Sequence, residues 1–154
     1  MNMVNSQKKG KDFEREVVRL LTALTGKQWH RVPNSGAFST KYDVQDSRFK
    51  GDLYCEDEQY KDWLIECKIT GDNLNLEALL NSTSPIWKWW KQATEEAKGK
   101  IPILIFRCKH SPTFAMMEQG EREQANRTET DRWSLLTDAK DIDGLVLGKL
   151  EAKA

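Results

Sequence analysis

The sequence predicts a mixed α/β fold, in which helices flank a central mixed sheet. Three features lead to this prediction: an amphipathic segment at 11–25, a hairpin pattern over 51–68 and an apolar run at 100–108. The 154 residues are enough for one domain with a single hydrophobic core, and no internal repeat is evident. We therefore treat 1–154 as a single domain.

The composition indicates a water-soluble protein of a reducing compartment. Hydrophobic residues make up 38% and charged residues 31%, and no apolar run approaches the roughly 18 residues of a membrane span. The first eleven residues are polar, unlike a signal peptide. The three cysteines, Cys55, Cys67 and Cys108, lack the spacing of a zinc site, and their odd number argues against a disulfide framework. We expect a cytoplasmic protein with no membrane partner.

Charge is distributed unevenly along the chain. The formal net charge is zero, but residues 1–50 hold ten Lys and Arg against five Asp and Glu. That segment therefore carries +5, and residues 51–154 carry −5. Such asymmetry permits a local basic patch on a neutral protein.

The first helix is predicted over 11–25, after a loose tail at 1–9. Its apolar residues recur at helical spacing, and Gly26 follows as a stop signal. They are Phe13, Val17, Leu20, Leu21 and Leu24. Glu14 lies at the edge of this stripe, where a helix glutamate commonly pairs with a neighbouring Arg or Lys.

The segments 51–54 and 63–68 read as two strands joined by a polar turn centred near Gln59. This register places Asp52 opposite Glu66, with Cβ atoms about 5 Å apart. Glu66 and Lys68 share one face because side chains alternate along a strand. Two close carboxylates repel each other, so the trio is suited to holding Mg²⁺. The alternative is an ordinary exposed hairpin face.

The other elements follow from local patterns. Strands are predicted at 28–32, 100–108, 113–117 and 133–136, and helices at 74–80, 85–98 and, weakly, 138–150. The strand at 100–108 is expected at the centre of the sheet because its apolar run is continuous. Residues 37–50 and 118–131 are predicted loops. His30, without a partner at metal-ligand spacing, is interpreted as structural.

Trp87 falls outside the buried stripe of the helix at 85–98. An exposed tryptophan beside Lys91 suggests a dimer contact, a DNA contact or a local cover for a loop, and the sequence does not choose among the three.

Three segments in the first 70 residues resemble the PD-(D/E)XK nuclease superfamily and, within it, the archaeal-type Holliday junction resolvases. Residues 9–15 (KGKDFER) are similar to the opening KGxxxER motif, and residues 31–36 (RVPNSG) resemble the RxPxSG loop. Asp52 with residues 65–68 (IECK) resembles the D…(I)ExK core. The resemblance implies a restriction-endonuclease-like core and a homodimeric, Mg²⁺-dependent enzyme that cuts branched DNA, with Mn²⁺ as a substitute.

The resemblance also implies roles for individual residues. Asp52, Glu66 and the backbone carbonyl of Cys67 would bind the ion, with Glu14 completing the acidic cluster, and Lys68 would orient the attacking water. The residues implied in DNA binding are Lys8, Lys9, Lys11, Arg31, Asn34, Ser35 and Lys41.

The chain also departs from this pattern. It is neutral where resolvases tend to be basic, and Gly51 replaces the usual Pro before the first core Asp. A neutral protein binds DNA through local patches, which makes its affinity strongly dependent on salt. Two alternatives therefore stay open: a restriction, repair or phage nuclease that cuts duplex or flapped DNA, and a non-catalytic DNA-binding module with the same fold.

Overall fold

The computed structural model describes residues 3–33, 50–118, 135–142 and 144–151. These residues form one seven-stranded sheet in the order β1-β2-β3-β4-β5-β7-β6, in which β3 and β4 are parallel and all other neighbours antiparallel. The strands are β1 (His30–Arg31), β2 (Leu53–Tyr54), β3 (Trp63–Ile69), β4 (Ile101–Arg107), β5 (Phe114–Glu118), β6 (Leu136–Ile142) and β7 (Leu145–Leu150). The helices are α1 (Met3–Thr25), α3 (Leu76–Leu80) and α4 (Pro85–Ala97).

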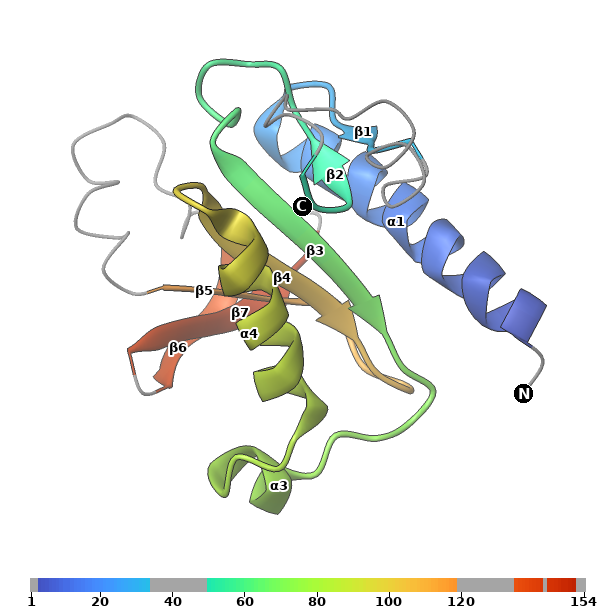
Figure 1. The fold of residues 1–154 in the computed structure, drawn as a ribbon, viewed down its shortest axis with the longest axis vertical. Helices are drawn as coiled ribbons and strands as arrows, with labels where there is room; N and C mark the ends of the chain where they lie inside the picture. Colours follow the sequence, from blue (N-terminus) through green and yellow to red (C-terminus); the bar gives the residue numbers. More distant parts are fainter. Residues whose placement is uncertain (1–2, 34–49, 119–134, 143, 152–154) are drawn as a thin grey trace.

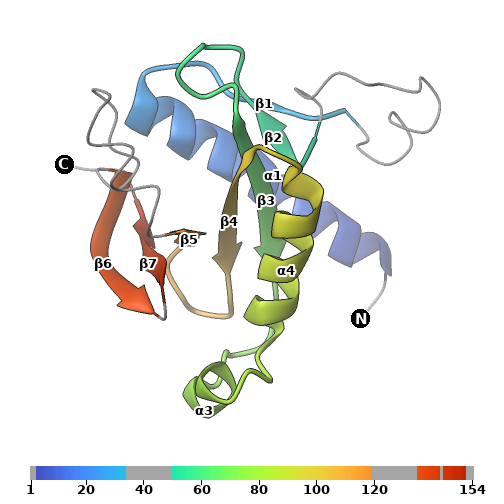
Figure 2. The ribbon, with the colours of Figure 1, turned by 60° about the vertical axis from the view of Figure 1, so that its left-hand side comes forward.

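Helices α1 and α4 cover opposite faces of the sheet (Figures 1 and 2). Odd-numbered residues of β4, such as Ile103 and Ile105, pack in the core cluster under α1, and even-numbered ones, such as Leu104 and Phe106, pack in the cluster under α4. This confirms the predicted mixed α/β class and a central strand covered on both faces. Among the described residues, no helix is both long and apolar enough to cross a membrane.

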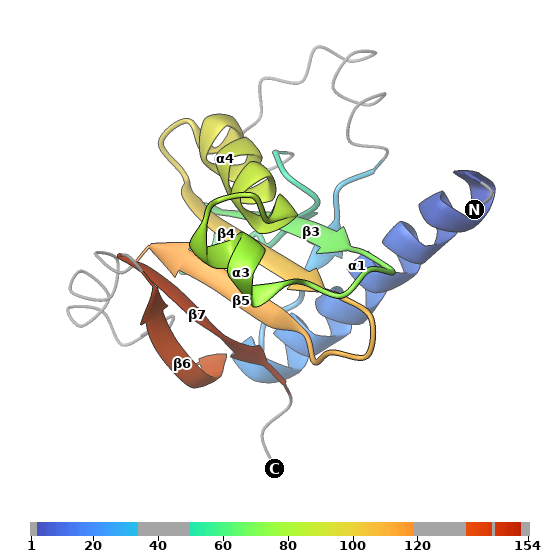
Figure 3. The ribbon, with the colours of Figure 1, turned by 90° about the horizontal axis from the view of Figure 1, so that it is seen from below.

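Helix α1 is longer than predicted. Residues 3–9, expected as a loose tail, are helical, because extending a formed helix costs far less than nucleating one. The predicted stripe is confirmed, with Phe13, Val17 and Leu21 buried. The N-terminal half projects beyond the sheet on the side away from β6 and β7 (Figures 1 and 3).

The predicted hairpin is confirmed, including its register. Leu53 of β2 pairs with Ile65 of β3, which places Asp52 opposite Glu66. The backbone N–H of Asp52 donates to the carbonyl of Ile65 at 2.8 Å. The predicted strand at 28–32 is present as the short β1, whose His30 stacks on Tyr54 with ring centroids 5.2 Å apart.

Gly51 occupies a backbone position that no other residue fits well. Its φ is +77°, and a Cβ there would lie 2.7 Å from the carbonyl oxygen of Ile65. Proline, with φ fixed near −65°, could not adopt this conformation. The departure from the family pattern at this position therefore has a local cause, the close approach of the chain to β3.

We expect Gly51→Ala to destabilise the fold by roughly 2 to 4 kcal/mol, from the left-handed φ and from overpacking against β3. Gly26→Ala is the matched control, because Gly26 has φ +71° but a Cβ added there would have no heavy atom within 4 Å. It should cost only about 1 to 2 kcal/mol. Urea denaturation measures both, and equal losses would show that the contact with Ile65 is unimportant.

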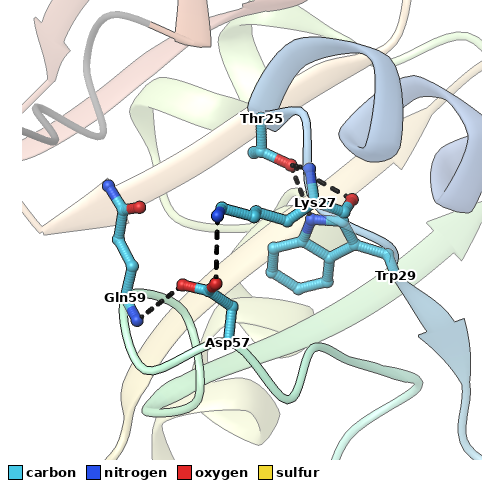
Figure 4. A network of polar contacts seen from close by, with 5 residues as sticks. All are labelled: Thr25, Lys27, Trp29, Asp57 and Gln59. Atoms are coloured by element: carbon cyan, nitrogen blue, oxygen red, sulfur yellow. Dashed lines mark hydrogen bonds and ion pairs between the residues drawn. The ribbon is translucent and has the colours of Figure 1, made fainter.

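The far end of the hairpin is tied to the end of α1 (Figure 4). The Lys27 ammonium pairs with Asp57 at 3.2 Å, and the Trp29 indole N–H donates to the Thr25 hydroxyl at 3.0 Å. The Trp29 ring also packs against the aromatic rings of the hairpin. These contacts fix the hairpin relative to α1, from which Glu14 projects.

The connection from β3 to β4 passes through α3 and α4, as predicted. Ser84 caps α4, with Pro85 in its first turn, and Lys98 ends it in the left-handed conformation. Trp87 is half-buried, and its indole N–H donates to the carbonyl of Leu79 in α3 at 2.9 Å. This contact supports the interpretation of Trp87 as a local cover, rather than a dimer contact or a DNA contact.

The predicted helix at 138–150 is wrong, because this segment forms the β6–β7 hairpin. Burial alternates along β7 with Val146, Gly148 and Leu150 inward, which is a strand period rather than a helical one. Gly144 adopts φ +82°, and its N–H donates to the Asp141 carboxylate at 3.1 Å. The Asp-Gly pair at 143–144 is a strong hairpin signal that outweighs the helical spacing. In the predicted loop at 118–131, residue 118 ends β5 and the rest lies outside the described residues.

Candidate active site

Asp52 and Glu66 meet across the β2–β3 hairpin. Their side chains lie within hydrogen-bonding distance of each other, which agrees with the predicted register. One carboxylate oxygen of Asp52, Oδ2, also accepts from the backbone N–H of Cys67 at 2.8 Å. The backbone of β3 therefore holds Asp52 in place beside Glu66.

Burial makes this pair of carboxyls costly to ionise. Glu66 is only 5% exposed. Burial first, then a hydrogen bond with Glu96 and the charge of Asp52, raises the pKa of Glu66 to about 10. Burial also raises the pKa of Asp52, and the negative charge of Glu14 acts in the same direction, whereas the Cys67 N–H opposes it. In the metal-free protein, the site therefore holds a proton.

Glu96 is part of this cluster, although it was not predicted from the sequence. It lies on α4, contacts Glu66 by a side-chain hydrogen bond and accepts from the Gln92 amide at 3.2 Å. Ala93 and Ala97 of the same helix are buried, so Glu96 lies at the flank of the packed stripe of α4. The sequence shows this flanking position, but it indicates a place for Glu96 in the site only when α4 is known to pack on the sheet face that carries Glu66.

Lys68 lies beside the carboxylates on the α4 face of the sheet. Glu66 and Lys68 pair in register with Leu104 and Phe106, whose side chains belong to the core cluster under α4. The charge of Lys68 favours ionisation of Asp52, partly offsetting the burial that raises the pKa of that carboxyl. The Cys67 side chain packs on the other face, against the cluster under α1.

Glu14 approaches the site from α1. Its carboxylate accepts a hydrogen bond from the Arg31 Nε at 2.9 Å, the kind of pairing that is common for a helix glutamate. Its charge also contributes to the raised pKa of Asp52, behind the effect of burial. Glu14 is thus close enough to the Asp52–Glu66 pair for its charge to act on Asp52.

The donor set suits a hard divalent ion. Carboxylate oxygens are the ligands that Mg²⁺ prefers, and it needs only one or two of them when water completes its shell. Without a metal, a bound proton relieves the repulsion between Asp52 and Glu66. A cation between the two carboxylates would relieve it in place of the proton. Within the described ranges, no three His, Cys, Asp or Glu side chains are grouped closely enough to hold an ion by themselves. The residues therefore fit an ion that keeps several waters.

The predicted DNA-binding residues fall in three places. Lys8, Lys9 and Lys11 lie on the projecting half of α1, and Arg31 lies on β1 in its ion pair with Glu14. Asn34, Ser35 and Lys41 lie outside the described residues.

Taken together, a mixed sheet between helices and an acidic pair with a lysine on one hairpin define a nuclease core of the PD-(D/E)XK type. A family model described as "Phage putative PDDEXK endonuclease" matches residues 5–144. The chain belongs to this phage PDDEXK endonuclease family. Membership implies a nuclease whose substrate is DNA.

Protein D14 of Escherichia phage T5 is a relative, 29% identical over 153 residues, covering 96% of this chain and 91% of the relative. The name of this relative does not state an activity. No solved structure gives a significant match.

Proposed function

We infer that the chain is a divalent-metal-dependent DNA endonuclease that cuts phosphodiester bonds in branched DNA. The observation that supports it most is the buried contact between Asp52 and Glu66, with Lys68 on the same strand face. A buried acidic pair is expensive as a structural device. It is useful where a cation must be held beside a phosphate.

In this proposal, Asp52 and Glu66 would hold Mg²⁺, or Mn²⁺ in its place, and the backbone carbonyl of Cys67 would be a further ligand. The chemistry that a divalent ion would supply there is an activated water and neutralisation of charge on the phosphate. The Lys68 ammonium orients the attacking water by a hydrogen bond and stabilises the negative phosphate oxygens. Glu14 would complete the acidic cluster directly or through water, while Arg31 holds its carboxylate in place.

The preference for branched DNA rests on the three motifs that resemble the junction resolvases. A homodimer would present two sites to the symmetric strands of a four-way junction. The match to a phage endonuclease family supports a second candidate, a nuclease that cuts duplex or flapped DNA. The cluster of Glu14, Asp52, Glu66 and Lys68 favours both candidates over a non-catalytic DNA-binding module.

A panel of labelled substrates tests the proposal. Purified protein is incubated with a four-way junction, a flap and a linear duplex of matched sequence, with Mg²⁺, Mn²⁺ or a chelator. We expect nicking of the junction with either metal, none with the chelator, and slower nicking of the duplex. The solution mass of the protein, measured in parallel, should be that of a dimer.

Equal cutting of junction and duplex would favour the second candidate and remove branched DNA from the proposal. Inertness towards every substrate with both metals, by a protein that still binds DNA, would favour the non-catalytic module.

A further inference from the structure

A cavity of about 760 Å³ opens beside the candidate active site. It is lined by residues of the projecting half of α1 and of the C-terminal ends of β3 and β4. The C-terminal residues of β3 and β4 and the connections that follow them, within 67–71 and 107–111, form most of its wall. Its volume falls in the range of small-molecule sites, which is large enough for a nucleotide.

The wall of this cavity is positively charged. Lys9, Lys68, Arg107 and Lys109 line it, and none of its lining residues is Asp or Glu. In the part of the chain that the structure describes, no carboxylate forms an ion pair with Lys9, Lys68 or Lys109. A surface with unbalanced positive charge attracts anions. The whole chain has zero net charge, so this wall is more positive than the protein as a whole.

Two contacts fix Arg107 in the wall. Its guanidinium pairs with Glu16 of α1 at 2.8 Å and lies over the Phe13 ring, 4.8 Å from the centroid. The side chain is 28% exposed, so its remaining N–H groups can still reach a ligand. An arginine held in this way loses little conformational freedom when it binds an anion.

The β4–β5 turn presents Lys109 outward. The backbone N–H of Cys108 donates to the Ser111 hydroxyl at 3.0 Å, and the N–H of Ser111 donates to the Cys108 carbonyl at 3.1 Å. Between them, Lys109 and His110 are exposed at the mouth of the cavity. The turn thus carries a lysine and an imidazole on a short, hydrogen-bonded loop.

The cavity and the acidic pair share one residue, Lys68. Strands β3 and β4 are parallel, so their C-terminal ends meet at one edge of the sheet, where Ile69 pairs with Arg107. Lys68 therefore borders the carboxylates and the cavity at once. A strand of DNA whose scissile phosphate lies at the acidic pair would carry a neighbouring phosphate past this wall.

We propose that this basic cavity is a second phosphate site, which binds a phosphate of DNA next to the one that is cut, with Lys109 and Arg107 as its main contacts. The proposal rests on the proposed endonuclease function. The phosphate could be internal to the strand or terminal, since both present the same anionic oxygens.

The test measures DNA binding rather than cutting. Lys109→Ala is compared with Lys140→Ala, an exposed lysine of the edge strand β6, both in an Asp52→Asn background that leaves the DNA intact. Each lost phosphate contact lowers the steepness of log affinity against log salt by about 0.7 to 0.9, which is roughly a five- to eightfold loss of affinity at 0.1 M salt relative to 1 M. We expect this change for Lys109→Ala and none for Lys140→Ala.

A neutral methylphosphonate scanned along the strand then locates the contact. At one position next to the cut, it should weaken binding by the Lys140→Ala protein more than binding by the Lys109→Ala protein, in which only Arg107 is left to contact that phosphate. Ends carrying a 5′-phosphate or a 5′-hydroxyl are compared in parallel. A loss of affinity that depends on Lys109 and occurs at an internal position identifies a backbone phosphate. A loss confined to ends with a 5′-phosphate identifies a terminal phosphate. Either result supports the site.

The proposal is overturned if Lys109→Ala and Lys140→Ala share one salt slope and respond alike to every methylphosphonate. This result would leave the endonuclease proposal standing if the wild-type protein still cuts DNA. Failure of cutting with a retained Lys109-dependent slope would instead remove the endonuclease proposal and keep a DNA-phosphate site.

Discussion

Replacing Asp52 by asparagine is expected to abolish DNA cutting while fold and DNA binding survive. The amide oxygen of asparagine can still accept from the Cys67 N–H, so the hairpin contact at 2.8 Å is retained. The negative charge that holds the ion is lost, and with it several kcal/mol of transition-state stabilisation, a fall of roughly 10³-fold or more. Because burial and the charge of Glu14 disfavour the ionised Asp52, thermal stability should hold or rise.

The matched control lies in the same hairpin. Asp57 carries the same side chain at the turn, where it pairs with Lys27 and accepts from the Gln59 N–H at 3.0 Å (Figure 4). Asp57→Asn should cut DNA at the wild-type rate. Initial nicking rates and a DNA-binding isotherm are measured for all three proteins.

A further readout separates loss of the ion from loss of the chemistry. The thermal shift produced by Mg²⁺ should vanish in Asp52→Asn but remain in Lys68→Met, which keeps the apolar stem of the lysine and should also be inactive. Cutting by Asp52→Asn at a rate comparable with the wild type would rule out Asp52 as a metal ligand.

The hairpin was predictable because local rules decide it. The alternation along 63–68 and the turn near Gln59 set the register, and the structure has Leu53 opposite Ile65 as required. Glu96 and Arg107 were not predictable in the same way. They reach the site from α4 and the end of β4, and sequence alone does not state which helix covers which face or how two parallel strands align.

The errors at the two ends of the chain have different causes. At residues 3–9 the polar composition concealed a helix that continues one already formed. At 138–150, the spacing of apolar residues was compatible with a helix, whereas the turn residues favoured a hairpin. Periodicity is weak evidence over short segments, and turn chemistry should have decided this one.

The stability of the metal-free protein should fall as pH rises from 5 to 8. The pKa of Glu66 is raised from its ordinary value of 4.5 to about 10, so the folded state keeps a proton that the unfolded chain has released. The contribution of Glu66 to stability is then fully present below pH 4.5 and is lost as pH rises towards 10. At about 1.4 kcal/mol per pH unit, the loss between pH 5 and 8 is roughly 4 kcal/mol.

That proton belongs to the group of carboxyls rather than to one residue, since Glu66 is hydrogen-bonded to both Asp52 and Glu96. The pKa of Asp52 is raised as well, chiefly by burial, and acts in the same direction. The pKa of Glu96 is lowered, chiefly by its hydrogen bond with Glu66, so its opposite effect falls below pH 4.5, outside this window. Guanidinium denaturation in chelator at half-unit pH steps measures the slope.

Mg²⁺ should reverse this dependence because a carboxyl must lose its proton to bind the ion. Affinity for the ion should therefore rise up to about tenfold per pH unit for one proton displaced. Glu66→Gln should flatten the pH slope in chelator and remove the response to Mg²⁺. Glu95→Gln is the control, since Glu95 is exposed and pairs with Lys91 on α4 at 3.9 Å. A wild-type stability that does not fall between pH 5 and 8 would mean that Glu66 is ionised without metal, and the cluster would then need another source of positive charge.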